Sequence, residues 1–286
     1  MEFRTIVNIE KPQWLIKPAE RILFVGSCFA DRIGQRFAEE HFPVTVNPYG
    51  VMYNPASILH TVERVKDDEC GEGNYDVAVL TLGTNHVYIE KATGEIVDNC
   101  QKRPQSLFKE QELTIAECAD YLQQTINLLR RWNPEMKVIL TVSPIRYQKY
   151  GYHRSQLSKA TLLLAVEEVL NDSSLHSRAS LADPSPFTLH SPLYYFPAYE
   201  IVNDELRDYR FYNPDMLHPT DQTVEYIWQR LVDTCFSDAA RQYLEEWRPL
   251  KQALSHRPFH PESAQYQQFL QKTEEQLKAF ETKWGF

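Results

Sequence analysis

Short apolar runs alternate with helical repeats along most of the chain, and this alternation predicts its secondary structure. Residues 22–25, 75–82 and 137–142 are almost continuously apolar, as the strands of a parallel sheet are when helices cover both faces. The shorter β-branched run 42–46 predicts a further strand. Apolar residues at helical spacing predict helices within the intervening segments, at 29–37, 55–65, 114–132, 154–171 and 220–236.

This succession of strands and helices implies right-handed crossovers and a parallel sheet. We therefore expect an α/β fold over residues 1–236, a three-layer α/β/α sandwich with a parallel sheet of about five strands. The aromatic, proline-rich stretch 184–212 is expected to contain the last strand. The irregular segment 87–113 is expected to be a long loop or a small insertion.

The C-terminal residues 237–286 form a separate pattern. Their apolar residues recur at helical spacing and are interrupted at 257–261, which predicts a helical extension of one or two amphipathic helices packed on the domain. The pattern leaves three uses open for this extension: it covers the sheet, forms a homodimer contact, or closes over a site as a lid.

The turn at Gly26 and Ser27 is the first candidate for chemistry, because a predicted strand ends there and a predicted helix begins. Ligands of parallel α/β sheets bind beyond the carboxyl ends of the strands, where the first backbone N–H groups of the next helix are unpaired. Ser27 is therefore a candidate nucleophile. It is equally a candidate helix cap, since serine is a preferred N-cap residue.

Further candidates follow later strands and precede the last helix of the domain. Asn85 comes directly after the strand 75–82, so its amide is a candidate donor to developing negative charge, or else an ordinary turn residue. Asp215 and His218 are three residues apart, so one loop turn can present both to the same crevice. A carboxylate beside an imidazole orients it as a general base requires, although this spacing is frequent by chance.

Several motifs together resemble the GSCFA family. The residues Gly26-Ser27-Cys28-Phe29-Ala30 are similar to the signature of that family. Segments 47–55, 83–85, 143–146, 195–200 and 215–219 resemble its later blocks, in its order. The family is a branch of the SGNH/GDSL-type hydrolases, so the resemblance implies their flavodoxin-like fold and an esterase activity, for example on acyl groups such as acetyl carried by carbohydrate.

The resemblance also implies roles for individual residues. Ser27 is the implied nucleophile, His218 the base and Asp215 the residue that orients it, and the implied oxyanion donors are Ser27, Gly50 and Asn85. Two positions depart from the wider superfamily. Its Gly-x-Asn-Asp pattern has His86 here in place of the acid, and the first block differs from Gly-Asp-Ser.

Other functional classes have less support in the sequence. A thiol enzyme would need an exposed sulfur of low pKa, whereas we expect Cys28 to be packed beside Phe29. Of the histidines, His86, His153 and His190 belong to no ligand motif, so we expect no metal and no other cofactor. The remaining alternative is a non-catalytic carbohydrate- or partner-binding module that retains the fold.

Charge and cysteine content narrow the set of partners. The chain has 30 basic and 39 acidic residues and a net charge of −9, which argues against nucleic acid or an anionic membrane as a partner. Its five cysteines include no Cys-x-x-Cys pair, so we expect reduced thiols. The sequence shows no apolar run of membrane-spanning length and no signal-peptide pattern at its start, and we expect a cytoplasmic protein.

Overall fold

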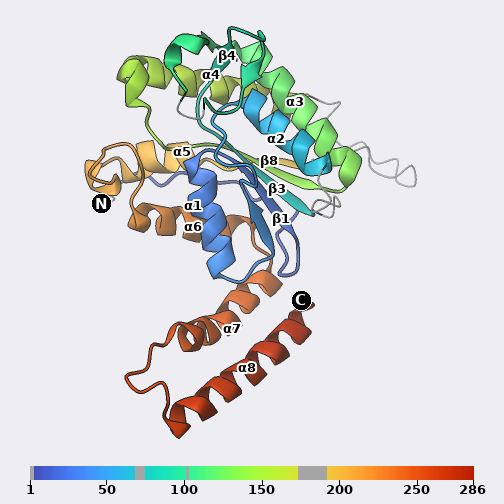
Figure 1. The fold of residues 1–286 in the computed structure, drawn as a ribbon, viewed down its shortest axis with the longest axis vertical. Helices are drawn as coiled ribbons and strands as arrows, with labels where there is room; N and C mark the ends of the chain where they lie inside the picture. The colour runs from blue at the N-terminus through green and yellow to red at the C-terminus, as the bar shows by residue number, and fades with distance from the viewer. Residues whose placement is uncertain (1–2, 68–74, 101–102, 173–191) are drawn as a thin grey trace.

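The main sheet has five parallel strands. The computed structural model describes residues 3–67, 75–100, 103–172 and 192–286. Outside these ranges lie His190, positions 184–191 of the aromatic stretch, and Cys70, which is one of the five cysteines. The strand order is β2-β1-β3-β7-β8 (Figure 1). The strands are β1 (Ile22–Gly26), β2 (Val44–Val46), β3 (Val77–Leu82), β7 (Lys137–Val142) and β8 (Leu193–Tyr195). The predicted parallel sheet is confirmed, including a last strand within the aromatic stretch.

Helices cover both faces of this sheet. Alternate residues of each buried strand point to opposite faces, so both faces are apolar and both need to be covered. Ile22 and Phe24 of β1 join one apolar cluster, and Leu23 and Val25 join the other. The first face is covered by α1 (Cys28–Glu39), α5 (Ala198–Glu200) and α6 (Asp221–Cys235). The second is covered by α2 (Pro55–Asp67), α3 (Ile115–Trp132) and α4 (Gly151–Asn171) (Figure 1). The fold is the three-layer α/β/α sandwich that the sequence predicts.

Polar side chains fix where the helices begin. Thr114 and Glu117 form the reciprocal capping box at the start of α3. Thr220 caps α6 by accepting a hydrogen bond from the Thr223 N–H. Ser27 likewise caps α1, with the Phe29 N–H as donor. The predicted helices therefore begin within a few residues of their expected positions.

Segment 87–113 contains most of a small antiparallel sheet rather than a structureless loop. Its strands are β4 (His86–Glu90), β5 (Ile96–Val97) and β6 (Phe108–Glu112), in the order β5-β4-β6. The sequence of β6 is mostly charged and exposed, so its strand character comes from pairing with β4 and leaves little apolar pattern. The expectation of a small insertion is thereby met.

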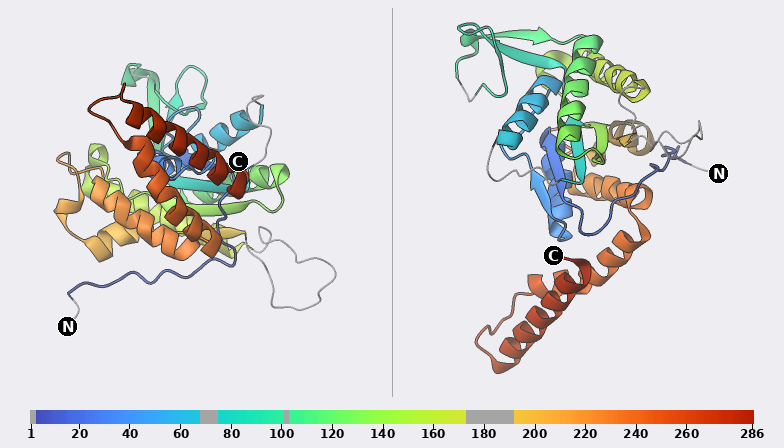
Figure 2. Two further views of the ribbon diagram at one scale, coloured as in Figure 1. Left: turned by 90° about the horizontal axis from the view of Figure 1, so that it is seen from below. Right: turned by 90° about the vertical axis from the view of Figure 1, so that its right-hand side faces the viewer.

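Two helices, α7 (Asp238–Ser255) and α8 (Ala264–Trp284), lie side by side and extend away from the sheet (Figure 2). The base of this hairpin is anchored to the end of α1. The Tyr243 hydroxyl donates to the His41 carbonyl oxygen at 2.6 Å, and the Trp247 indole N–H donates to that of Glu39 at 3.0 Å. Among the described residues, no helix has both the length and the apolar character needed to cross a membrane.

Candidate active site

Three strands of the main sheet end side by side, and the residues that follow them meet at this edge. Gly26 of β1 pairs with Thr81 of β3, and Leu82 of β3 pairs with Val142 of β7. Ser27, Gly83 and Ser143 therefore occupy neighbouring positions beyond the strand ends. This is the edge where ligands of parallel α/β sheets bind.

Ser27 is enclosed in this edge by hydrogen bonds to β3. The residue is fully buried, and its Oγ lies 3.0 Å from the Thr81 hydroxyl while accepting from the Phe29 N–H. Its own N–H donates to the carbonyl oxygen of Thr81 at 3.1 Å. Within the described part of the chain, Ser27 and His218, the nucleophile and base that the resemblance implies, are not hydrogen-bonded to each other. Ser27 here caps α1 and joins β1 to β3.

Asp215 and His218 form the predicted pair in the loop before α6. Asp215 Oδ2 lies 2.7 Å from His218 Nδ1, and Asp215 Oδ1 accepts the backbone N–H groups of His218 and Leu217. The hydrogen bond from the His218 N–H contributes most, followed by that from the Leu217 N–H, and together these bonds lower the pKa of Asp215 to about 2. An ionised carboxylate only accepts hydrogen bonds, so Nδ1 must carry the proton and Nε2 is left free to take one.

Arg146 positions this loop from the end of β7. Its guanidinium donates to the Met216 carbonyl oxygen at 3.0 Å, and its backbone N–H donates to that of Leu217 at 3.1 Å. Met216 has a φ of 59°, an uncommon value for a residue other than glycine. Arg146 thus supports the loop at Met216 and at the residue that follows it.

A cavity of about 200 Å³ lies between the start of α1 and this loop. Both Cys28 and His218 line it, whereas Ser27 is not among its described lining residues. The remaining lining residues are Phe29, Asp31, Arg32, Ile145, Asn213, Pro219 and Val224. Cys28 is partly buried and packs against the apolar cluster that contains Phe29, as the sequence analysis expects.

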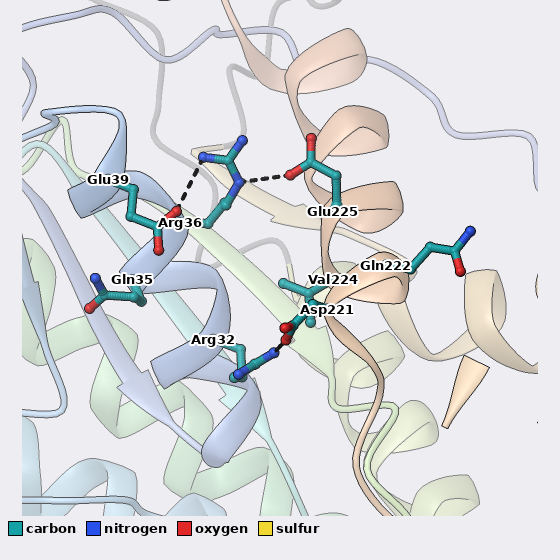
Figure 3. Close-up of a pocket in the computed structure, with 8 residues that line it drawn as sticks. All are labelled: Arg32, Gln35, Arg36, Glu39, Asp221, Gln222, Val224 and Glu225. Atoms are coloured by element: carbon teal, nitrogen blue, oxygen red, sulfur yellow. Dashed lines mark hydrogen bonds and ion pairs between the residues drawn. The ribbon is translucent and has the colours of Figure 1, made fainter. Parts of the chain in front are cut away.

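A polar groove of about 510 Å³ continues from the cavity between α1 and α6. Arg32 and Val224 border both spaces. Figure 3 shows two ion pairs across the groove, from Arg32 to Asp221 and from Arg36 to Glu225. The Arg36 Nε atom lies 2.8 Å from Glu225 Oε2. Apart from Val224, the described side chains that line it are charged or amide groups, which suits a hydroxyl-rich ligand better than an apolar one.

The three oxyanion donors expected from the sequence are already paired in this structure. The Asn85 amide donates to the Leu113 carbonyl oxygen at 2.7 Å, because Asn85 ties together the two ends of the antiparallel insertion. The Gly50 N–H closes a turn on the Asn47 carbonyl oxygen at 2.8 Å. The Ser27 N–H is bonded to Thr81. Each of the three groups thus makes a structural hydrogen bond, and their role as oxyanion donors stays a prediction.

The sequence analysis missed three residues beneath the site. Lys159 is 2% exposed and donates to the carbonyl oxygens of Gly83 and Ser143, at 2.6 and 2.7 Å. Its place on the buried stripe of α4, between buried Ser155 and Leu162, was the available signal. The Tyr53 hydroxyl lies 3.7 Å from Cys28 Sγ. The Tyr147 hydroxyl is buried and has no hydrogen-bond partner among the described residues.

Several solved structures are distantly similar to this chain. A Streptococcus pneumonia protein assigned provisionally as a platelet activating factor is 17% identical, with a TM-score of 0.49 over 77% of this chain and 85% of the other. An acetyl esterase mutant with acetate ion is 11% identical, with a TM-score of 0.42 over 79% and 99%. A carbohydrate esterase family 3 structure from Talaromyces cellulolyticus is 10% identical, with a TM-score of 0.38 over 79% and 99%. At these values the similarity assigns neither an activity nor a substrate.

Family models give a clear match, although no curated protein sequence matches the chain. The model of the GSCFA family matches residues 21–74 and 71–231. A second model, the C-terminal domain of GSCFA domain proteins, matches residues 247–285, which cover the second half of α7 and all of α8. Since the first model spans well over half of the sequence, this chain belongs to the GSCFA family.

Proposed function

We propose that this protein hydrolyses esters by acyl transfer, with His218 as the general base and Asp215 as the residue that orients it. The observation that carries the proposal is the 2.7 Å contact between Asp215 and His218 at the wall of a cavity that also reaches the first residue of α1. The first residue of α1 and the proposed base on the loop before α6 then face one cavity.

The hydrogen bonding of His218 suits proton transfer in both directions. Asp215 holds Nδ1, so Nε2 can take the proton of the attacking group and later give it to the leaving alcohol. Asp215 is charged at neutral pH, and the backbone N–H groups of His218 and Leu217 lower its pKa further below the ordinary value, to about 2. Its charge stabilises the imidazolium that forms during the reaction.

The two spaces at the site support a small acyl group on a polar alcohol. A cavity of about 200 Å³ is smaller than usual ligand sites of ~300 to 1,000 Å³, and it suits a short acyl group such as acetyl. The adjoining groove between α1 and α6 offers charged and amide side chains to hydroxyl groups. We therefore propose acylated carbohydrate as the substrate class.

The test is hydrolysis of p-nitrophenyl acetate and of acetylated oligosaccharides by the wild type and two histidine variants. We expect His218→Ala to lower kcat by ~100 to 10,000-fold, the range for loss of a general base. The matched control is His260→Ala, which removes an exposed histidine near the tip of the α7–α8 hairpin and should leave kcat unchanged.

Two outcomes would overturn this function. A His218→Ala enzyme that keeps the wild-type rate would remove His218 from catalysis. A folded wild type that hydrolyses none of these esters, yet binds the same oligosaccharides by calorimetry, would make the chain a carbohydrate-binding module.

A further inference from the structure

Cys28 occupies the position in the fold from which a nucleophile can reach the cavity. It is the first residue of α1, directly after the cap Ser27, and its side chain is only partly buried. It shares the cavity wall with His218. The ring of Tyr147 packs against that of Tyr53, with centroids 6.1 Å apart, and the buried Tyr147 hydroxyl has no hydrogen-bond partner among the described residues. Burial raises the pKa of Tyr147, and a charge on Cys28 would raise it further.

Ser27 has the opposite environment. Its hydroxyl has no exposed surface, and the Thr81 hydroxyl and the Phe29 N–H both hold it. A substrate carbonyl could approach Ser27 Oγ only if the turn between β1 and α1 opened. Such an opening would break the backbone bond from Ser27 to Thr81 as well.

The surroundings of the thiol indicate how it would be activated. Burial raises the pKa of Cys28, the hydrogen bond from Tyr53 opposes this, and Asp31 adds to the rise. The thiol is therefore protonated at rest and needs a base, which Nε2 of His218 supplies. The pKa of Tyr53 is raised to about 12 by burial, so its hydroxyl remains a donor to the sulfur as negative charge develops.

We propose that Cys28 Sγ, and not Ser27 Oγ, is the nucleophile of this site. The inference rests on the acyl-transfer function proposed above. Sγ forms a bond to the ester carbonyl carbon as its proton moves to His218 Nε2. The carbon–oxygen bond then breaks, the alcohol leaves with that proton, and the acyl group remains on Cys28 as a thioester.

Water completes the cycle. His218 takes a proton from the water as its oxygen attacks the thioester carbonyl carbon. The carbon–sulfur bond breaks, the carboxylic acid leaves, and the proton returns from His218 to the sulfur. The balance therefore requires only ester and water, and it gives alcohol and acid.

The test compares Cys28→Ala, Cys28→Ser and Ser27→Ala with the control Cys100→Ala, which removes another free, partly buried cysteine. We expect Cys28→Ala to lower kcat by at least ~100-fold, with Cys28→Ser retaining more activity than Cys28→Ala. Ser27→Ala should lower the thermal midpoint through loss of the helix cap while its folded fraction keeps turning over. Cys100→Ala should match the wild type.

A trapped intermediate locates the acyl group directly. Wild-type enzyme is quenched in acid during turnover and digested with trypsin, and the peptide 22–32, which contains both Ser27 and Cys28, is fragmented by mass spectrometry. We expect the added acyl mass on Cys28 and its removal by neutral hydroxylamine. Acyl mass on Ser27, or full turnover by Cys28→Ala, would overturn the inference.

The failure of this inference differs from the failure of the proposed function. If esters are hydrolysed and His218 is required, but Cys28→Ala is as active as the wild type, only the identity of the nucleophile is wrong. If the wild type hydrolyses no ester, or His218→Ala is fully active, the acyl-transfer function itself fails.

Discussion

The turn after β1 and the loop before α6 both reach the cavity, but they are held in different ways. The turn is fixed by contacts distant in sequence: Ser27 bonds to Thr81, 54 residues away, and is fully buried. The loop is fixed largely by local contacts between Asp215 and His218, whose side chains are 44% and 43% exposed. One side of the site is therefore part of the core, and the other lies on the surface.

This difference separates the expected effects of substitution. A change in the turn after β1 disturbs sheet pairing and helix capping together, so it should act mainly on stability. A change to Asp215 or His218 in the loop before α6 leaves the core intact, because the bonds between these two residues are local and exposed, so it should act mainly on turnover. Three predictions test this comparison, beginning with the largest effect.

Gly26→Ala should be the most disruptive of these changes. Gly26 has a φ of 146°, and an added Cβ would lie within 3.0 Å of both backbone and side-chain atoms of Thr81. Because backbone atoms cannot move aside cheaply, we expect the free energy of unfolding to fall by ~4 kcal/mol or more, or folding to fail. Urea unfolding and soluble yield are the measurements.

Gly94→Ala is the matched control for this clash. Gly94 also has a positive φ, 77°, but an added Cβ there would meet no atom within 4 Å. Gly94→Ala should lower the free energy of unfolding by only ~1 kcal/mol, through backbone strain alone. Equal losses at the two positions would mean that the turn after β1 is no more tightly packed than a surface turn.

The main fold could be predicted from the sequence because burial of its strands and helices leaves apolar patterns along the chain. Buried parallel strands are apolar throughout, and capped helices show both a polar start and an apolar stripe, so both leave local patterns. The strands of the antiparallel insertion were harder to predict from the sequence pattern. Strand β6 contains mainly charged residues, and it becomes a strand by pairing with β4, whose neighbouring residues are about 20 positions away in the sequence.

The same distinction between local and distant contacts applies to the site. The contact between Asp215 and His218 was predictable because three residues separate them, so a local turn suffices. The environments of Ser27 and Cys28 were not, because a different strand supplies the group that encloses Ser27. The sequence did contain one signal for Cys28. In Gly-Asp-Ser the serine is the second residue after the glycine, and Cys28 has the same position in Gly26-Ser27-Cys28.

The second prediction concerns Lys159, which supports the buried side of the site. Burial lowers the pKa of Lys159 from 10.5 to about 7 in the folded protein. Between these values the unfolded chain holds a proton that the folded protein has released, so stability must rise with pH in this window. The free energy of unfolding of the wild type should therefore rise by about 2 kcal/mol more than that of Lys159→Met when the pH is raised from 7 to 9.

Urea unfolding at several pH values measures this difference. Lys272→Met, at an exposed position on α8, is the control and should show no such change relative to the wild type. If the difference between the wild type and Lys159→Met stays constant over this range, the folded protein holds Lys159 charged through its bonds to Gly83 and Ser143.

The smallest effect is expected on the exposed side, from Arg146→Lys. The guanidinium donates to the Met216 carbonyl oxygen and lies over the rings of Tyr152 and Tyr212, at 4.4 and 5.4 Å. Lysine keeps the charge but lacks the planar fork that makes both contacts. The backbone N–H of Arg146 still holds Leu217, so the loop should loosen without unfolding.

We therefore expect Arg146→Lys to lower kcat by ~3 to 10-fold, about 1 kcal/mol, with the thermal midpoint unchanged within ~2 °C. KM should change less than kcat, because the substitution displaces the His218 base more than it alters the groove between α1 and α6. Arg207→Lys, at an exposed arginine outside the cavity lining, should alter neither. A lower thermal midpoint with unchanged kcat would show that this loop, like the turn after β1, supports the fold and not the chemistry.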